Sequence, residues 1–169
     1  MQTLKIFITI FLLTIGRTIS ACDCNPQGNF LRVASNTKLV ALVKVTKYLT
    51  FKDIYDVQTP MSMEVEIIEI YKGEESRKTV TVWGDIGNLC RPYLSRFDEE
   101  QFYVIAFYAG ADGSKGGVHA NEKTTDYAIS NCGEYWLDVD FINKIATGSV
   151  SDNQNQITLD ELKSSLDIK

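Results

Sequence analysis

Catalytic motifs are missing from this sequence. His119 is its one histidine, and the chain contains no H-E-x-x-H, no G-x-S-x-G and no glycine-rich phosphate loop. Zinc hydrolases, serine hydrolases and nucleotide-binding enzymes depend on these motifs. No evident nucleophile accompanies His119, so we expect this side chain to be exposed rather than catalytic. The sequence therefore predicts neither an enzyme nor a cofactor of the protein's own.

Concentrated positive charge is also missing. The 169 residues include 17 Lys and Arg against 22 Asp and Glu, and nowhere do five cations follow one another. Without Lys5 and Arg17, which lie in the first 21 residues, 15 cations remain and the net charge falls to −7. Nucleic acids, heparin and anionic membranes bind proteins through basic surfaces. We therefore expect no nucleic acid and no other polyanion as a general partner.

Long hydrophobic runs are rare, and the longest lies at the start of the chain. Residues 6–15 are mostly apolar, follow Lys5, and are followed by two small residues just before Cys22. Ten residues are too few to span a bilayer core of about 30 Å, but they suit the core of a secretory signal. We therefore expect residues 1–21 to be a signal peptide and the mature protein to begin at Cys22. Such a protein would be secreted, extracellular or periplasmic.

Cysteines are few, and all of them follow the expected signal peptide. The four are Cys22, Cys24, Cys90 and Cys132. An even number of cysteines in an exported protein indicates disulfides. A Cys22–Cys24 bridge would be strained, which leaves two pairing schemes, and both tie the two N-terminal cysteines to distant partners. A metal site is the alternative, although the spacing lacks the paired knuckles of structural zinc sites.

Alternation of apolar and polar residues predicts a mainly β protein. The segments with this pattern or with a short apolar run are 38–48, 61–67, 78–83, 102–108 and 126–132. Five short strands separated by turns fit a small closed structure, a five-stranded OB-fold-like barrel. We expect the aromatic side chains of Trp83, Tyr103, Phe107 and Trp136 in the core. Residues 22–148 would form this single domain.

One or two helices are expected to flank the barrel. Residues 26–37 contain turn formers and then apolar residues, typical of a short helix or a packed loop. Apolar residues recur at roughly helical spacing over 136–145, and Thr158 with Glu161 forms a capping box that would open a helix over 159–168. Residues 149–169 are accordingly expected to be a linker and a helix. Four glycines within 110–117 predict a mobile loop.

The cysteine pattern resembles the netrin-like module of tissue inhibitors of metalloproteinases. The Cys-x-Cys motif at Cys22 is similar to the start of that family's mature chains, and Cys90 follows Cys22 by 68 residues while Cys132 follows Cys24 by 108. These spacings are similar to those of the family's disulfides. Residues 39–45 look like the family's first strand, and residues 102–106 look like its apolar strand.

The resemblance covers about residues 22–135. The third disulfide of the animal inhibitors' N-terminal domain is missing, as is their six-cysteine C-terminal domain. The chain therefore resembles a minimal, single-domain version of the module, and a bacterial origin would fit it.

The resemblance implies an inhibitor of zinc metalloendopeptidases. In that family the α-amine and carbonyl of the first cysteine chelate the zinc of the protease, so Cys22 would be the ligand in trans. Asp23 would face the S1′ pocket, and Asn88 and Leu89 would fill neighbouring subsites. The implied disulfides are Cys22–Cys90 and Cys24–Cys132. The expected partner is a zinc metalloendopeptidase, bound by a monomer.

Two features of the N-terminus favour other functions. Asp23 stands where the family usually has Thr or Ser, and an ionised carboxylate costs about 1–3 kcal/mol in an apolar pocket. Residues 19–22 resemble a bacterial lipobox, and lipidation of Cys22 would anchor the protein to a membrane and leave an odd number of cysteines. The alternative function is a disulfide-linked secreted or lipid-anchored binding module without inhibitory activity.

Overall fold

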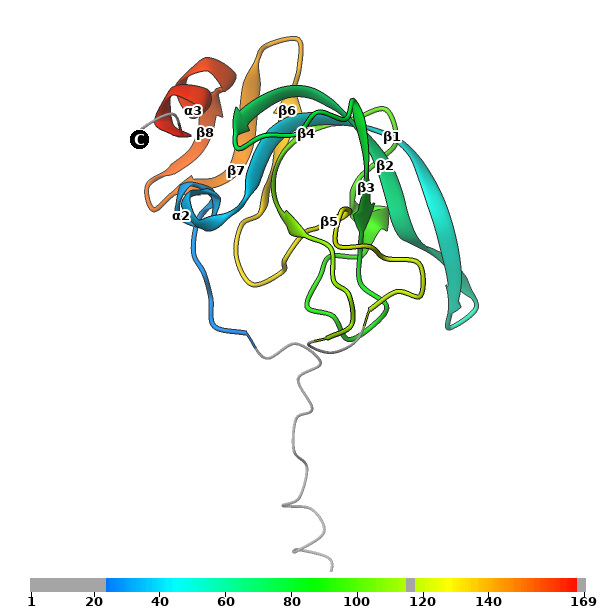
Figure 1. The fold of residues 1–169 in the computed structure, drawn as a ribbon. Helices are drawn as coiled ribbons and strands as arrows, with labels where there is room; N and C mark the ends of the chain where they lie inside the picture. Colours follow the sequence, from blue (N-terminus) through cyan, green and yellow to red (C-terminus); the bar gives the residue numbers. More distant parts are fainter. Residues whose placement is uncertain (1–23, 115–117, 167–169) are drawn as a thin grey trace, which may run out of the picture.

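The computed structural model describes residues 24–114 and 118–166 (Figure 1). The expected signal peptide, Cys22 and Asp23 lie outside the described residues, and so does part of the glycine-rich stretch. The elements are α2 (Phe30–Asn36), β1 (Leu39–Ile54), β2 (Val57–Lys72), β3 (Thr79–Trp83), the short 3-10 helix η1 (Leu94–Arg96), β4 (Phe102–Ala109), β5 (Tyr127–Ala128), β6 (Trp136–Asp140), β7 (Ile145–Ser151), β8 (Gln154–Thr158) and α3 (Leu159–Leu166).

Strands β1 to β5 close into a barrel. The order is β1-β2-β3-β5-β4, and β4 pairs back with β1. Each of these pairs is antiparallel except β3–β5, which is parallel. Closure removes the free edges that an open sheet of these strands would expose. The predicted five-stranded OB-fold-like barrel is thereby confirmed, although its fifth strand is much shorter than expected.

The barrel is filled by side chains from all around it. Trp83, Tyr103 and Phe107 are at most 5% exposed, which confirms the prediction for these three aromatic residues. Trp136 is half-buried instead, with the guanidinium of Arg96 5.2 Å from the centre of its ring. The largest fully buried side chains include Phe30, Phe97, Phe107, Leu39, Met63 and Leu94.

The prediction of a helix over residues 136–145 is wrong. This segment is strand β6 followed by the turn into β7, and β6 pairs with β4 on one side and β7 on the other. Leu137 is buried while Asp138 and Asp140 are exposed, so a period of two governs the segment. The carboxylate of Asp140 accepts hydrogen bonds from the amides of Ile142 and Asn143, which fixes the turn.

The segment expected to be a linker is also a strand in part. Gln154–Thr158 forms β8, which pairs antiparallel with β7 and extends the sheet beyond the barrel. Its outward residues are polar and exposed, so the sequence lacks the strong alternation that marks the other strands.

Two helices pack beside the extended part of the sheet (Figure 1). Helix α2 confirms the expected short helix, and its N-cap residue Asn29 accepts a hydrogen bond from the amide of Arg32 at 3.1 Å. Helix α3 begins with the predicted capping box, because the amide of Glu161 donates to the Thr158 hydroxyl while the Glu161 carboxylate accepts from Thr158. Leu162 of α3 is fully buried.

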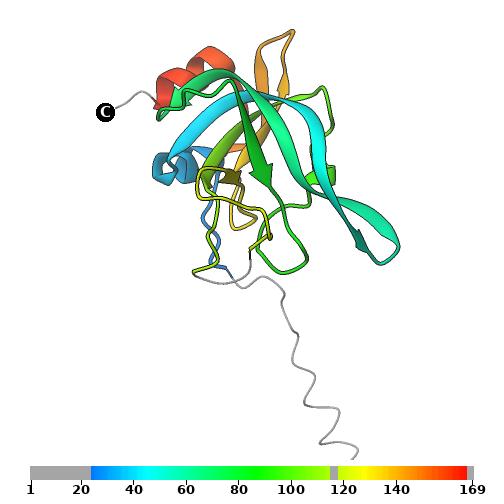
Figure 2. The same cartoon turned by 45° about the vertical axis from the view of Figure 1, so that its right-hand side comes forward.

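The β1–β2 hairpin projects beyond the barrel as a two-stranded arm (Figure 2). At its tip Tyr55 and Asp56 have φ values of 53° and 62°, the conformation that a tight two-residue hairpin turn requires. The carboxylate of Asp53 accepts a hydrogen bond from the Asp56 amide at 3.0 Å. Phe51 is 53% exposed and Tyr55 95%, so the arm offers apolar surface to solvent.

Candidate functional site

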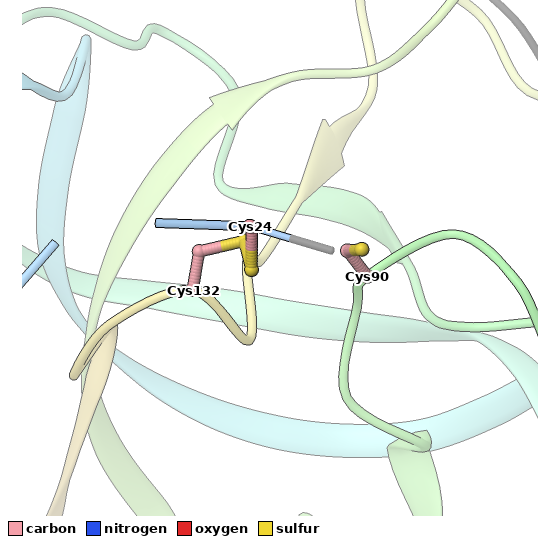
Figure 3. A group of neighbouring side chains, drawn as sticks. All are labelled: Cys24, Cys90 and Cys132. Atoms are coloured by element: carbon pink, nitrogen blue, oxygen red, sulfur yellow. A yellow bond between two sulfur atoms is a disulfide. The ribbon is translucent and has the colours of Figure 1, made fainter. Parts of the chain in front are cut away.

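Three of the predicted site cysteines meet at one end of the barrel (Figure 3). Cys24 forms a disulfide with Cys132, with 5.7 Å between their Cα atoms, so this predicted pair is confirmed. Cys90 is also disulfide-bonded, and its expected partner Cys22 lies outside the described residues. The sulfur atoms of Cys24, Cys90 and Cys132 all lie within 4.8 Å of one another. The N-terminal segment, the β3–β4 connection and the β5–β6 connection therefore converge on one point.

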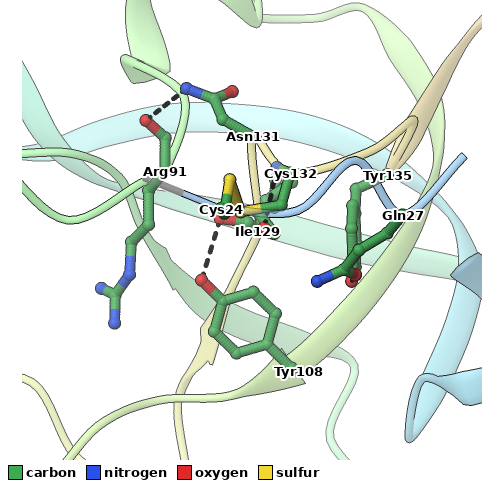
Figure 4. Close-up of a disulfide and its surroundings, with 9 residues drawn as sticks. Cys24, Gln27, Arg91, Tyr108, Ile129, Asn131, Cys132 and Tyr135 are labelled. Atoms are coloured by element: carbon green, nitrogen blue, oxygen red, sulfur yellow. Dashed lines mark hydrogen bonds between the residues drawn. A yellow bond between two sulfur atoms is a disulfide. The ribbon is translucent and has the colours of Figure 1, made fainter. Parts of the chain in front are cut away.

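Hydrogen bonds hold the same segments together. The backbone amide of Asn131 donates to the Cys90 carbonyl at 2.8 Å. Its side-chain amide donates to the Arg91 carbonyl, also at 2.8 Å (Figure 4). The amide of Gln27 donates to the Cys132 carbonyl at 2.6 Å, and the Tyr135 hydroxyl donates to the Gln27 side chain. These hydrogen bonds involve the residues that follow β5. Strand β5 therefore ends at Ala128, and the chain after it pairs with Cys90 and the N-terminal segment instead.

The loop that carries Asn88 and Leu89 is built around a buried carboxylate. One carboxylate oxygen of Asp85 accepts hydrogen bonds from the amides of Asn88 and Leu89, at 3.0 and 2.6 Å. Asp85 itself is 9% exposed, whereas Asn88 is exposed and Leu89 half-buried. Cys90 follows with a φ of 53°, which turns the chain back towards Cys132. The structure thus brings Cys24, Asn88 and Leu89 to the same end of the barrel.

Removal of this carboxylate should loosen the loop. Asp85→Ala leaves two amides without their acceptor, so we expect the free energy of unfolding to fall by about 1.5–3 kcal/mol. Chemical denaturation measures the change. Asp53→Ala is the matched control, because Asp53 makes the same kind of turn in the exposed arm, and it should cost less than about 0.5 kcal/mol. Equal losses in the two variants would show that burial of Asp85 adds nothing.

A groove separates this loop from the arm. It has a volume of about 460 Å³ and runs between the arm tip, at Ile54 and Tyr55, and the loop side chains of Ile86, Asn88 and Tyr93. Its walls are exposed or half-buried and mix apolar with polar side chains. The loop and the arm tip therefore face each other across this groove, and the loop continues directly into Cys90. No pattern in the sequence indicates this groove, because the arm and the loop are far apart along the chain.

A buried ion pair lies next to the loop that carries Cys90. The guanidinium of Arg91 donates two hydrogen bonds of 2.9 Å to the carboxylate of Glu122, and their side chains are 5% and 0% exposed. The Ala111 amide donates to the same carboxylate at 2.6 Å. Burial alone would raise the pKa of Glu122, but the hydrogen bonds from Arg91 and Ala111 outweigh it and hold this pKa below its ordinary value. The pair joins the Cys90 loop to the connection between β4 and β5.

His119 is buried beside the Arg91–Glu122 pair, so the expectation of an exposed histidine is wrong. It is 8% exposed, its Nε2 lies 2.8 Å from the Gly84 carbonyl oxygen, and its ring lies 4.7 Å from that of Trp83. Burial lowers the pKa of His119, although the Gly84 carbonyl and Glu122 oppose the shift. No spacing in the sequence links His119 to Trp83 or Gly84, and only the folded chain brings them together.

The three sulfurs are also the group in the described part of the chain that has the spacing of a metal site. A metal binds the thiolate form of cysteine, and the sulfurs of a disulfide carry no thiolate. The bonded Cys24 and Cys132 therefore favour a covalent link over the metal site that the sequence left open.

This arrangement of cysteines, loop and arm is not matched to a known family by its sequence: no protein-family model matches the chain, and no curated protein does. Among the residues that the structure describes, no helix is long and apolar enough to cross a membrane.

Proposed function

We propose that this protein is a secreted inhibitor of zinc metalloendopeptidases that uses Cys22 as its first residue and as the zinc ligand. The observation that supports this most directly is the convergence of the Cys24, Cys90 and Cys132 sulfurs within 4.8 Å of one another. Residue 24 is thereby fixed to the barrel only two residues after the proposed new N-terminus. The exposed Asn88 lies two residues before Cys90, on the same end of the molecule.

The proposed chemistry needs only a short, rigid N-terminus. A neutral α-amine and a carbonyl oxygen suit Zn²⁺, and a catalytic zinc keeps one position open for water or substrate. With a pKa of about 7.7, an α-amine readily loses its proton at neutral pH. Cys22 would bind the metal through these two atoms and displace the attacking water. The Cys24–Cys132 disulfide, together with the proposed Cys22–Cys90 disulfide, would lower the entropy lost on binding.

The surrounding surface suits a protein partner. Asn88 and Leu89 would contact the protease beside its zinc. The groove between Asn88 and the arm tip would receive a further segment of the protease. Tyr55 and Phe51 add exposed aromatic area, the kind of side chain enriched at protein interfaces. The chelating end supplies the inhibition, and this surface would supply selectivity.

A single added residue tests the chelation. The protein that begins at Cys22 should inhibit at least one zinc endopeptidase, and an alanine placed before Cys22 should weaken inhibition at least about 100-fold, because a peptide nitrogen replaces the α-amine. Inhibition assays on a panel of zinc endopeptidases measure the ratio. Matching thermal unfolding of both proteins, and an intact mass lower by four hydrogens, serve as controls for folding. Equal potency would contradict the mechanism, and an acyl mass on Cys22 would exclude it.

Asp23→Thr should change which proteases are inhibited. Asp23 would place a carboxylate in the S1′ pocket, and its removal from an apolar pocket should tighten binding by about tenfold to 100-fold. Inhibition constants against proteases with apolar and with basic S1′ pockets measure this, and the basic pockets should lose affinity. Asp138→Thr on the exposed face of β6 is the matched control for net charge. No gain with any apolar pocket would mean that residue 23 does not enter S1′.

A second candidate function is a disulfide-linked binding module without inhibitory activity. The arm favours it, because Phe51, Tyr55 and Val57 are 53%, 95% and 61% exposed. A partner that binds the N-terminally extended protein as tightly as the protein that begins at Cys22 would support this function over the first.

A further inference from the structure

We propose that the sulfurs of Cys24, Cys90 and Cys132 form a thiol–disulfide exchange centre, in which Cys90 displaces Cys24 from Cys132. The proposal that this exchange regulates inhibition rests on the proposed function, whereas the exchange itself does not. The product would have a Cys90–Cys132 disulfide and an N-terminal segment without a covalent link to the barrel.

The positions of the sulfurs make Cys90 the attacking group. A disulfide is exchanged when a thiolate reaches one of its sulfurs and forms a new bond as the old one breaks. The Cys90 sulfur lies within 4.8 Å of both sulfurs of the Cys24–Cys132 bond. Contact requires only part of this separation to close, and rotation of the Cys90 side chain about Cα–Cβ moves its sulfur without any movement of the barrel strands.

The backbone around Cys90 favours Cys132 as the new partner. Asn131, the residue before Cys132, donates hydrogen bonds of 2.8 Å to the carbonyls of Cys90 and Arg91. Figure 4 shows the bond to Arg91. These bonds connect two loops of the barrel and involve no atom of the N-terminal segment. A Cys90–Cys132 bond would therefore join segments that are already adjacent, and Cys24 would be the leaving group.

The exchange begins with a reductant and then proceeds without one. A small dithiol reduces the disulfide of Cys90 and is itself oxidised to its cyclic disulfide. The Cys90 thiolate then bonds to the Cys132 sulfur as the Cys24–Cys132 bond breaks, and the electron pair leaves on the Cys24 sulfur, which takes a proton from water. This second step involves no net oxidation or reduction. Mildly reducing conditions would thus release the proposed inhibitory end while the barrel stays folded.

The Cys22→Ser variant tests the second step without any added dithiol. The purified variant is incubated at several pH values, pulse-labelled with an alkylating reagent, acidified and mapped by mass spectrometry. We expect the label to appear on Cys24 together with a Cys90–Cys132 peptide. Between pH 6.5 and 7.5 the rate should rise about tenfold, because the thiolate fraction rises tenfold per unit below a thiol pKa near 8.5. Label found on Cys90 alone at every time and pH would overturn the proposal.

Two further measurements keep the result unambiguous. Cys22→Ser combined with Cys90→Ser lacks the attacking thiol, so its Cys24–Cys132 bond should remain intact and unlabelled. The native protein treated with a limiting dithiol is mapped in the same way, which replaces the variant if that variant does not fold. Loss of protease inhibition should follow the labelling of Cys24 in time. Exchange without any inhibitory activity would overturn the proposed function alone, and inhibition with all label on Cys90 would overturn the exchange alone.

Discussion

Replacement of both Cys24 and Cys132 by serine should lower the free energy of unfolding by about 4–5 kcal/mol, since their disulfide closes a loop of about a hundred residues. The two cysteines are 108 residues apart in the sequence. In the chain-entropy model the link removes conformations from the unfolded state, and its effect grows with the length of the loop it closes. A loss of this size is a large share of the stability of a domain of this length. Chemical denaturation of the purified variant measures it.

The control for this prediction separates the covalent link from side-chain polarity. Cys24→Ala with Cys132→Ala should lose about as much stability as the serine pair, because both lack the same link. A loss below about 1 kcal/mol in both would show that noncovalent contacts suffice. The candidates would then be the hydrogen bond from Gln27 to the Cys132 carbonyl and the one from Glu134 to the Gly28 carbonyl.

Most of the barrel could be predicted from the sequence because its strands alternate in polarity. Residues 39–45 and 61–67 lie in β1 and β2, which pair antiparallel, and the predicted strands at 78–83 and 102–108 have close to the expected bounds. Local propensity and burial act together in these segments, so the pattern is clear. The capping box at Thr158 was also predictable, because its hydrogen bonds join residues only three positions apart.

Residues whose environment comes from distant parts of the chain could not be predicted. Residues 136–145 carry apolar side chains that fit a helix, but pairing of β6 with β4 and β7 outweighs that spacing. His119 is buried by Trp83 and Gly84, which are more than thirty residues away. At the site, the cysteine count left two pairing schemes, and only the resemblance implied that Cys24 and Cys132 would pair, whereas nothing indicated that Asp85 would hold the amide of Asn88.

The second large effect concerns the buried pair below the site. Glu122→Gln keeps the shape of the side chain but leaves the Arg91 charge buried without a partner, so we expect the free energy of unfolding to fall by about 3–5 kcal/mol. Glu66→Gln is the matched control: Glu66 pairs with Lys78 at 3.1 Å on the surface, where the Lys78 side chain is 80% exposed. That exposed pair should contribute less than about 1 kcal/mol. Chemical denaturation of both variants gives the comparison.

A double variant shows whether the loss comes from the unpaired charge. Arg91→Met combined with Glu122→Leu removes both charges and keeps apolar volume, so it should be more stable than Glu122→Gln alone. If the double variant loses as much as the single one, geometry rather than charge is what the pair provides. The remaining hydrogen bonds to the Glu122 carboxylate, from Ala111 and His119, would then be responsible.

His119 and Glu122 should make the free energy of unfolding depend on pH in two steps. The pKa of His119 is lower in the folded protein than its ordinary 6.5, so its contribution is complete above that value and is lost as the pH falls below it. The pKa of Glu122 is also lowered, so its contribution is complete above its ordinary 4.5 and is lost only as the pH falls further. Denaturation curves from pH 7.5 to 3.5 should show both losses in the native protein. Glu122→Gln should reduce the lower step and keep the upper one. Part of the lower step remains because the hydrogen bond with Arg77 also lowers the pKa of Glu75. A lower step as large in Glu122→Gln as in the native protein would contradict this assignment.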